Sequence, residues 1–161
     1  VEVLGERHTD TLTSLANLAS VTHAQGKLDE AEPLLREALR ASREVFGPSH
    51  TDSLAAANNL ALLLYAAGEF AEAEILHREA LAGRREALGA RHPETLISMN
   101  NLALLLKCQG EFDEAEVLYR EALETQREVL GPHHRDTLAS LNNLAVLLEA
   151  RGELAEAEPL Y

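Results

Sequence analysis

The stretch that decides the fold is HPETLISMNNLALLLKCQGEFDEAEVLYREAL, which runs from His92 to Leu123. A shift of 42 positions lays the 161-residue sequence on itself, so that residues of one kind fall in register. A fixed period of this size is typical of a solenoid, in which each repeat buries its apolar face only against its neighbours. The aligned columns are the histidines His8, His50, His92 and His134, the asparagines Asn17, Asn59, Asn101 and Asn143, and the glycines Gly26, Gly68, Gly110 and Gly152.

Each repeat is expected to hold two helices, because apolar residues recur at three-and-four spacing on both sides of the central glycine. Pro93 fits the first helical position, where its missing N–H has no helical partner, which makes His92 the expected N-cap. Gly110 ends this first helix, since glycine tolerates the left-handed conformation of a helix C-terminus. The predicted ranges are 10–25, 52–67, 94–109 and 136–151 for the first helix (helix A), and 28–46, 70–88, 112–130 and a stub from 154 for the second (helix B).

Small residues recur where the helices are expected to cross. An alanine side chain lets two helix backbones approach near the lower end of the usual 8–10 Å range. In the first helix B the predicted buried stripe is Leu28, Ala31, Leu34, Leu35, Ala38, Leu39 and Val45. The alanine columns are Ala19, Ala61, Ala103 and Ala145 in helix A, and Ala31, Ala73, Ala115 and Ala157 with Ala38, Ala80 and Ala122 in helix B.

These alanine columns resemble the tetratricopeptide repeat. The longer period, together with the N-N-L-A-x-L-L pattern of helix A, is similar to the repeats of kinesin light chain and related proteins. The resemblance implies an all-α fold, a right-handed α-solenoid of antiparallel helix pairs. Residues 1–7 are expected to end a preceding repeat, and both ends look cut from a longer array. The repeats would be 8–49, 50–91, 92–133 and the truncated 134–161, together one domain.

Composition limits the class of partner. Asp plus Glu outnumber Lys plus Arg by 27 to 14, which gives a net charge of −13. This balance argues against nucleic acid and anionic membrane surfaces, which both bind cationic proteins. The one cysteine, Cys108, excludes an internal disulfide framework and suits a reducing compartment, so a cytoplasmic protein is expected.

Nothing in the residue patterns predicts catalysis, a metal or a cofactor. The histidine column is spaced by one repeat, too widely for a zinc site, and is better explained as a repeated helix cap. Cys108 falls where the other repeats have alanine, so a small buried or groove-lining residue is expected. Acidic triplets such as Glu114-Ala115-Glu116 recur on every helix B and are expected on its solvated outer face.

The asparagines of helix A are the candidate binding residues. Asparagine is a poor interior helix residue because its amide competes with the backbone. Its donor and acceptor match the peptide unit of an extended ligand. In the family that this chain resembles, helix A lines a concave peptide-binding groove. The alternative is that the amides bridge adjacent repeats, and each column can take one role. The candidate groove residues are Asn17, Asn58, Asn59, Asn100, Asn101, Asn142 and Asn143, with Leu62, Tyr65, Leu104, Lys107 and Val146.

The favoured hypothesis is a non-enzymatic module that binds an extended or helical segment of a protein partner in this groove. Helix A carries little charge after its first acidic residue, only Lys107, Glu149 and Arg151, so an acidic C-terminal tail is a poor fit. The alternative is a structural spacer, or an element that self-associates through its uncapped repeat ends, within a larger signalling or adaptor protein.

Overall fold

The computed structural model describes residues 28–161, which form helices joined by short loops, without a strand among them. The chain divides into two compact units, Val1–Ala87 and Leu88–Tyr161. The expected helix over 10–25, with Asn17, lies outside the described residues. The elements are α2 (Leu28–Phe46), α3 (Thr51–Ala67), α4 (Phe70–Leu88), α5 (Pro93–Gln109), α6 (Phe112–Val129), α7 (Arg135–Arg151), α8 (Leu154–Ala157) and the short 3-10 helix η1 (Glu158–Leu160).

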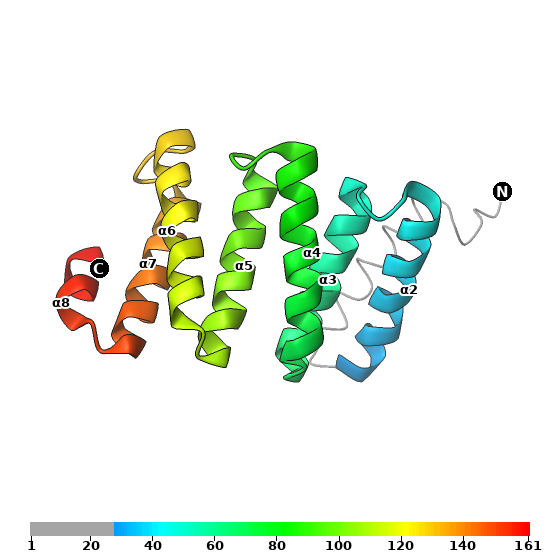
Figure 1. Ribbon diagram of the computed structural model, residues 1–161, viewed down its shortest axis with the longest axis horizontal. Helices are drawn as coiled ribbons and strands as arrows, with labels where there is room; N and C mark the ends of the chain where they lie inside the picture. The colour runs from blue at the N-terminus through cyan, green and yellow to red at the C-terminus, as the bar shows by residue number, and fades with distance from the viewer. Residues whose placement is uncertain (1–27) are drawn as a thin grey trace. The chain divides into compact units, whose positions relative to one another are not determined.

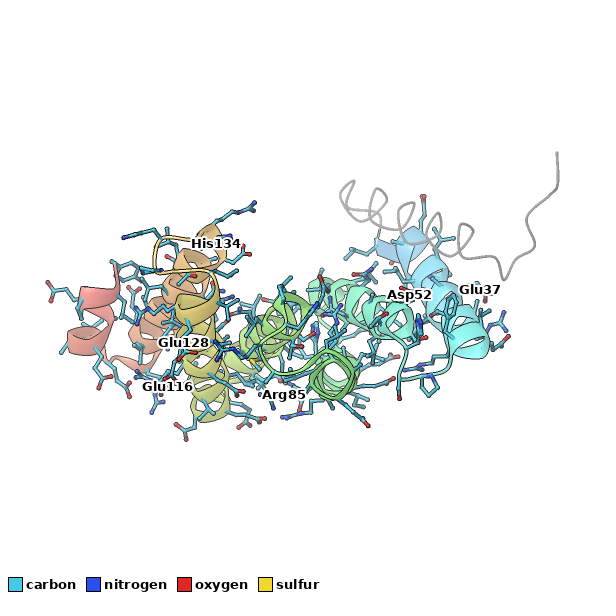
Figure 2. All side chains as sticks on the ribbon, turned by 90° about the horizontal axis from the view of Figure 1, so that it is seen from above. Glu37, Asp52, Arg85, Glu116, Glu128 and His134 are labelled. Carbon is cyan, nitrogen blue, oxygen red and sulfur yellow. The ribbon has the colours of Figure 1, made fainter. Side chains whose placement is uncertain are left out.

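The predicted caps are confirmed, and with them the helix bounds. The Nδ1 atom of His92 accepts a hydrogen bond of 3.2 Å from the backbone N–H of Glu94, and the histidines that precede α3 and α7 cap in the same way (His134 is labelled in Figure 2). At the other end of α5, Gly110 has φ of 86°, and the N–H of Glu111 donates back to Leu106 over 2.9 Å. This left-handed closure satisfies carbonyls that would otherwise lack a partner.

In the first unit, α3 packs against α2, and ion pairs join α2 to α4 (Figure 1). The predicted alanines at the helix crossings are almost fully buried, with Ala38 2% exposed. A second close approach was not predicted: a Cβ atom built on Gly83 of α4 would lie 2.5 Å from a methyl carbon of Leu54 on α3. The absence of a side chain at Gly83 therefore lets Leu54 fill the space between these helices. The other crossing alanines, Ala31, Ala61, Ala73 and Ala80, are each 0% exposed.

In the second unit, α5 and α6 form an antiparallel hairpin, α7 packs against α6, and α8 with η1 packs against α7 (Figure 1). The same alanines close these contacts: Ala103, Ala115, Ala122 and Ala145 are 0% exposed. The stub of the last helix B begins at Leu154 as predicted and tightens into η1 at Glu158. Its crossing alanine, Ala157, is 3% exposed.

One residue of the predicted buried stripe is misplaced. Val45 is 40% exposed, and Val129, its equivalent two repeats further on, is 43% exposed. Both lie in the last turn of a helix B, which the partner helix does not cover. Periodicity alone extended the apolar face one turn too far.

Ser53→Thr is expected to stabilise the first unit. The hydroxyl of Ser53 is buried without a hydrogen-bond partner, whereas Thr95 and Thr137 in the same register donate to the carbonyls of Gly89 and Gly131 over 2.8 and 2.9 Å. Threonine has a restricted χ1 angle, and the corresponding carbonyl is that of Gly47. The gain is about 1 kcal/mol, measured by urea unfolding. The reverse substitution Thr95→Ser is the matched control and should lose stability; a destabilised Ser53→Thr protein would contradict the prediction.

His77→Leu is expected to remove part of the acid sensitivity of folding. His77 is 1% exposed on α4, and burial, reinforced by the charge of Arg84, lowers its pKa from 6.5 to about 4. The unfolded chain therefore takes up a proton that the folded chain excludes. Stability is complete above pH ~6.5 and falls by up to ~3 kcal/mol as the pH drops toward 4.

Leucine occupies the same register at Leu35 and has no such proton. Urea unfolding at several pH values should give a shallower pH dependence for the His77→Leu protein than for the wild type. The same dependence in both proteins would mean that protonation of His77 does not drive acid unfolding.

Candidate functional site

In the second unit, the asparagine-bearing helices α5 and α7 contact each other and share a partly exposed face. Asn101 and Leu104 on α5 are half-buried, and so are their equivalents Asn143 and Val146 on α7. Residues three or four apart share one helix face, so these pairs stand in the same register on neighbouring helices. Together with the half-buried Lys107 of α5, these residues are called the asparagine face below.

The asparagine face can form hydrogen bonds but carries little charge. Each amide offers two N–H donors and a carbonyl acceptor. Leu104 and Val146 place apolar side chains one turn further along, and charge appears only at the next turn, as Lys107 on α5 and Glu149 on α7. Glu149 accepts a hydrogen bond of 3.0 Å from the hydroxyl of Tyr161, which raises the pKa of that tyrosine. The face therefore suits a ligand read through its backbone and one apolar side chain.

The first asparagine of each pair has another role where the structure shows its partners. The amide of Asn100 donates to the carbonyl of Leu96 and accepts from the hydroxyl of Ser140, each over 3.1 Å. Ser140 is 1% exposed on α7, so this bond joins the helices A of successive repeats. Asn58 is also buried, at 6% exposed, whereas Asn142 is exposed. The bridging alternative therefore holds for Asn100.

In the first unit, the predicted site residues of α3 also lie at a partly exposed surface. Asn59, Leu62 and Tyr65 are all half-buried. The ring of Tyr65 lies 5.8 Å from that of Phe70 at the start of α4, a tilted contact that orients it. Helix α3 thus presents an amide, an apolar and an aromatic side chain along one face.

Sequence reasoning missed Ile97 as part of the surface around Asn101, whereas it expected Cys108 to be either buried or groove-lining. Ile97 is 43% exposed and lies one turn before Asn101 on α5. Cys108 is exposed and lies one turn after Leu104, which rules out the buried position considered for it. The other repeats have alanine at the position of Cys108; at the position of Ile97 the first repeat has Thr13 and the other two have Ala55 and Ala139. The available signal was the four-residue offset from Asn101 and Leu104, which extends the same stripe.

On the outer side, the acidic triplets do more than face solvent. Arg36 on α2 donates to both carboxylate oxygens of Glu72 on α4, over 2.6 and 2.8 Å, and this bonding lowers the pKa of Glu72. In the second unit, Arg120 on α6 reaches Glu156 on α8 over 3.2 Å. Glu116, labelled on α6 in Figure 2, bonds Arg151 of α7 over 2.6 Å. These pairs tie successive repeats, an arrangement that the sequence pattern did not predict.

Several kinds of site are not found among the described residues. No group of three or more His, Cys, Asp or Glu side chains in residues 28–161 is placed to hold a metal ion. Within the same range, no helix is both long enough and apolar enough to cross a membrane. His77 is buried on α4, and its lowered pKa keeps it neutral.

Comparison with known proteins supports the repeat architecture. The tetratricopeptide repeat family model matches residues 1–44, 10–86, 52–128 and 100–161, which together span the chain. Comparison with curated proteins yields no match.

Solved structures are similar over nearly the whole chain. A Podosopora anserina protein described as a putative kinesin light chain with nearly identical TPR-like repeats is 30% identical, with a TM-score of 0.86; the match covers 99% of this chain and 75% of that one. BtubC (BKLC) from P. vanneervenii is 24% identical with a TM-score of 0.83, covering 93% of this chain and 60% of that one. PilF from Pseudomonas aeruginosa is 22% identical with a TM-score of 0.70, covering 97% and 60%, and supports the fold alone.

A double-mutant cycle of Asn100→Ala and Ser140→Ala is expected to show coupling in stability. Asn100→Ala leaves the hydroxyl of Ser140 without this acceptor, and Ser140→Ala leaves the amide of Asn100 without this donor. The double change removes both groups. The coupling free energy should be about 1 kcal/mol in urea unfolding. Strict additivity of the two changes would mean that the observed 3.1 Å bond contributes nothing to the contact between α5 and α7.

Proposed function

Because this chain belongs to the tetratricopeptide repeat family, we propose that its asparagine face binds an extended or helical segment of a partner protein. Tetratricopeptide repeats generally act as protein-interaction modules. The observation that carries the proposal is the pair Asn101 and Asn143, half-buried in one register on neighbouring helices. The proposed binding function needs no catalytic step and no cofactor, and we expect the protein to act in the cytoplasm.

The spacing of the two asparagines fits an extended ligand. Packed helices lie 8–10 Å apart, and an extended chain rises about 3.3 Å per residue. Asn101 and Asn143 would therefore meet the ligand backbone about three residues apart. Between them the ligand would present an apolar side chain toward Leu104 and Val146.

The division of the asparagine columns supports this assignment. Asn100 bonds Leu96 and Ser140, which holds α5 against α7 and keeps the second column in place. Binding would use the partly exposed Asn101 and Asn143, with Asn59, Leu62 and Tyr65 as the corresponding contacts in the first unit. With a net charge of −13 on the chain, a neutral or basic segment is the expected ligand.

Asn101→Ala and Asn143→Ala are expected to weaken peptide binding. Suitable ligands are selected from a random peptide library displayed on phage, with the wild-type chain as bait. Each lost hydrogen bond should cost about 1 kcal/mol, or roughly a fivefold weaker affinity. The chain has one cysteine, exposed Cys108, so an environment-sensitive dye attached there reports binding beside the face.

Asn142→Ala is the control for the first asparagine column, which holds Asn58, Asn100 and Asn142. Because Asn142 is exposed and lies outside the asparagine face, this change should leave the peptide affinity unchanged. Unchanged affinity in the Asn101→Ala and Asn143→Ala proteins, with a large fall in melting temperature, would assign these amides to bridging. Light scattering over a range of protein concentration tests the alternative function, since self-association predicts growth of the particle with concentration.

A further inference from the structure

A second candidate site lies in the first unit, between helices α2 and α4. A groove of about 460 Å³ opens between α2 and α4, with Leu60 of α3 at its base. Leu39 and Leu76 complete an apolar floor. Its volume falls within the range of ligand-binding clefts, and an apolar ligand that covered the floor would displace water from it.

Two ion pairs fix the width of this groove. Arg36 joins Glu72 over 2.6 and 2.8 Å, and Arg43 joins Glu79 over 2.6 Å, each from α2 to α4. The two arginines are seven residues apart, or about two helical turns. The pairs therefore span the groove at two levels and hold its walls, and the leucines between them are 2–6% exposed.

Arg36 and Arg40 each already bind two glutamates. Arg36 uses all three of its side-chain nitrogens, one toward Glu32 and two toward Glu72. Arg40 likewise uses all three, toward Glu37 and Glu44 of its own helix (Glu37 is labelled in Figure 2). Carboxylates bind a guanidinium in its plane, so these hydrogen bonds do not occupy the faces on which a ring stacks.

This bonding decides which ligand chemistry fits. Five glutamates surround the three arginines, so an anionic ligand would meet more negative than positive charge here. A planar ring needs none of the arginine donors: it can lie on the leucines and stack against guanidinium faces. Aromatic side chains and arginine are also the commonest energetic centres of protein interfaces.

We propose that this groove receives an aromatic side chain of a partner protein, held between the leucine floor and the faces of Arg36, Arg40 and Arg43. The site is independent of peptide binding at the asparagine face. Within the chain, Arg40 is peculiar to this groove, because Ala82 of α4 and Glu124 of α6 occupy its register. The first pair of repeats is therefore the one equipped with three arginines.

The test uses N-acetyl-tryptophanamide, a neutral probe, and N-acetyl-leucinamide as its aliphatic match. Leucine methyl groups are followed by NMR, and the chain contains no tryptophan, so new indole ring-current shifts come from the probe. The NMR signals of the methyl groups of Leu39, Leu60 and Leu76 should shift as the probe is added and reach a plateau, with a dissociation constant on the order of a millimolar. The leucine probe should bind at least about fivefold more weakly.

Arg40→Ala introduces the alanine that α4 has in the same register, at Ala82. It should weaken binding of the indole probe by roughly two- to fivefold. Arg127→Ala removes a similarly exposed arginine from α6 and should leave the affinity unchanged. Phage peptides that bind the wild type but not the Arg40→Ala protein should be enriched in Trp, Tyr or Phe. Equal binding of the two probes, an unaffected Arg40→Ala protein, or no aromatic enrichment would each overturn the proposal.

Discussion

Contact between helix backbones through alanine is the constraint on which this structure depends. At each described crossing the side chain is a single methyl group, and these alanines are at most 3% exposed. A larger side chain there would push two helices apart along their whole length, because cores are packed too tightly to absorb added volume. Gly83 carries the same requirement further, since a methyl group there would meet Leu54. The larger leucines fill the spaces that these close approaches leave.

The adjacent asparagines divide two tasks between them. Successive residues on a helix point about 100° apart, so one amide of the pair turns inward when the other faces outward. Asn100 turns toward the next repeat and bonds Ser140. Asn101 lies at the partly exposed face beside Leu104. A polar pair in the middle of a helix is thereby compatible with both a dry inter-repeat contact and a hydrogen-bonding surface.

How far the sequence predicted this structure depended on whether the interaction was local. Helix ends were predictable to within one residue because His92, Pro93 and Gly110 act on backbone groups a few positions away. Burial of the alanines followed from their period. Val45 was misjudged because periodicity does not say where the covering helix ends. The role of Glu72 was missed because its partner lies 36 residues away, on another helix. Ile97 escaped notice because no other repeat has a large apolar residue at that position.

The Arg36–Glu72 and Arg120–Glu156 pairs have a consequence for how such a chain can grow. Both join residues 36 positions apart, which is one repeat less six residues. Copying a whole 42-residue unit supplies the new arginine and glutamate together and preserves their offset. An insertion of another length in the helical part of a repeat would move one of the two along its helix and break the tie between repeats, leaving each arginine only the glutamate of its own helix. Expansion of the gene in whole repeats is therefore the route that keeps the electrostatic ties intact.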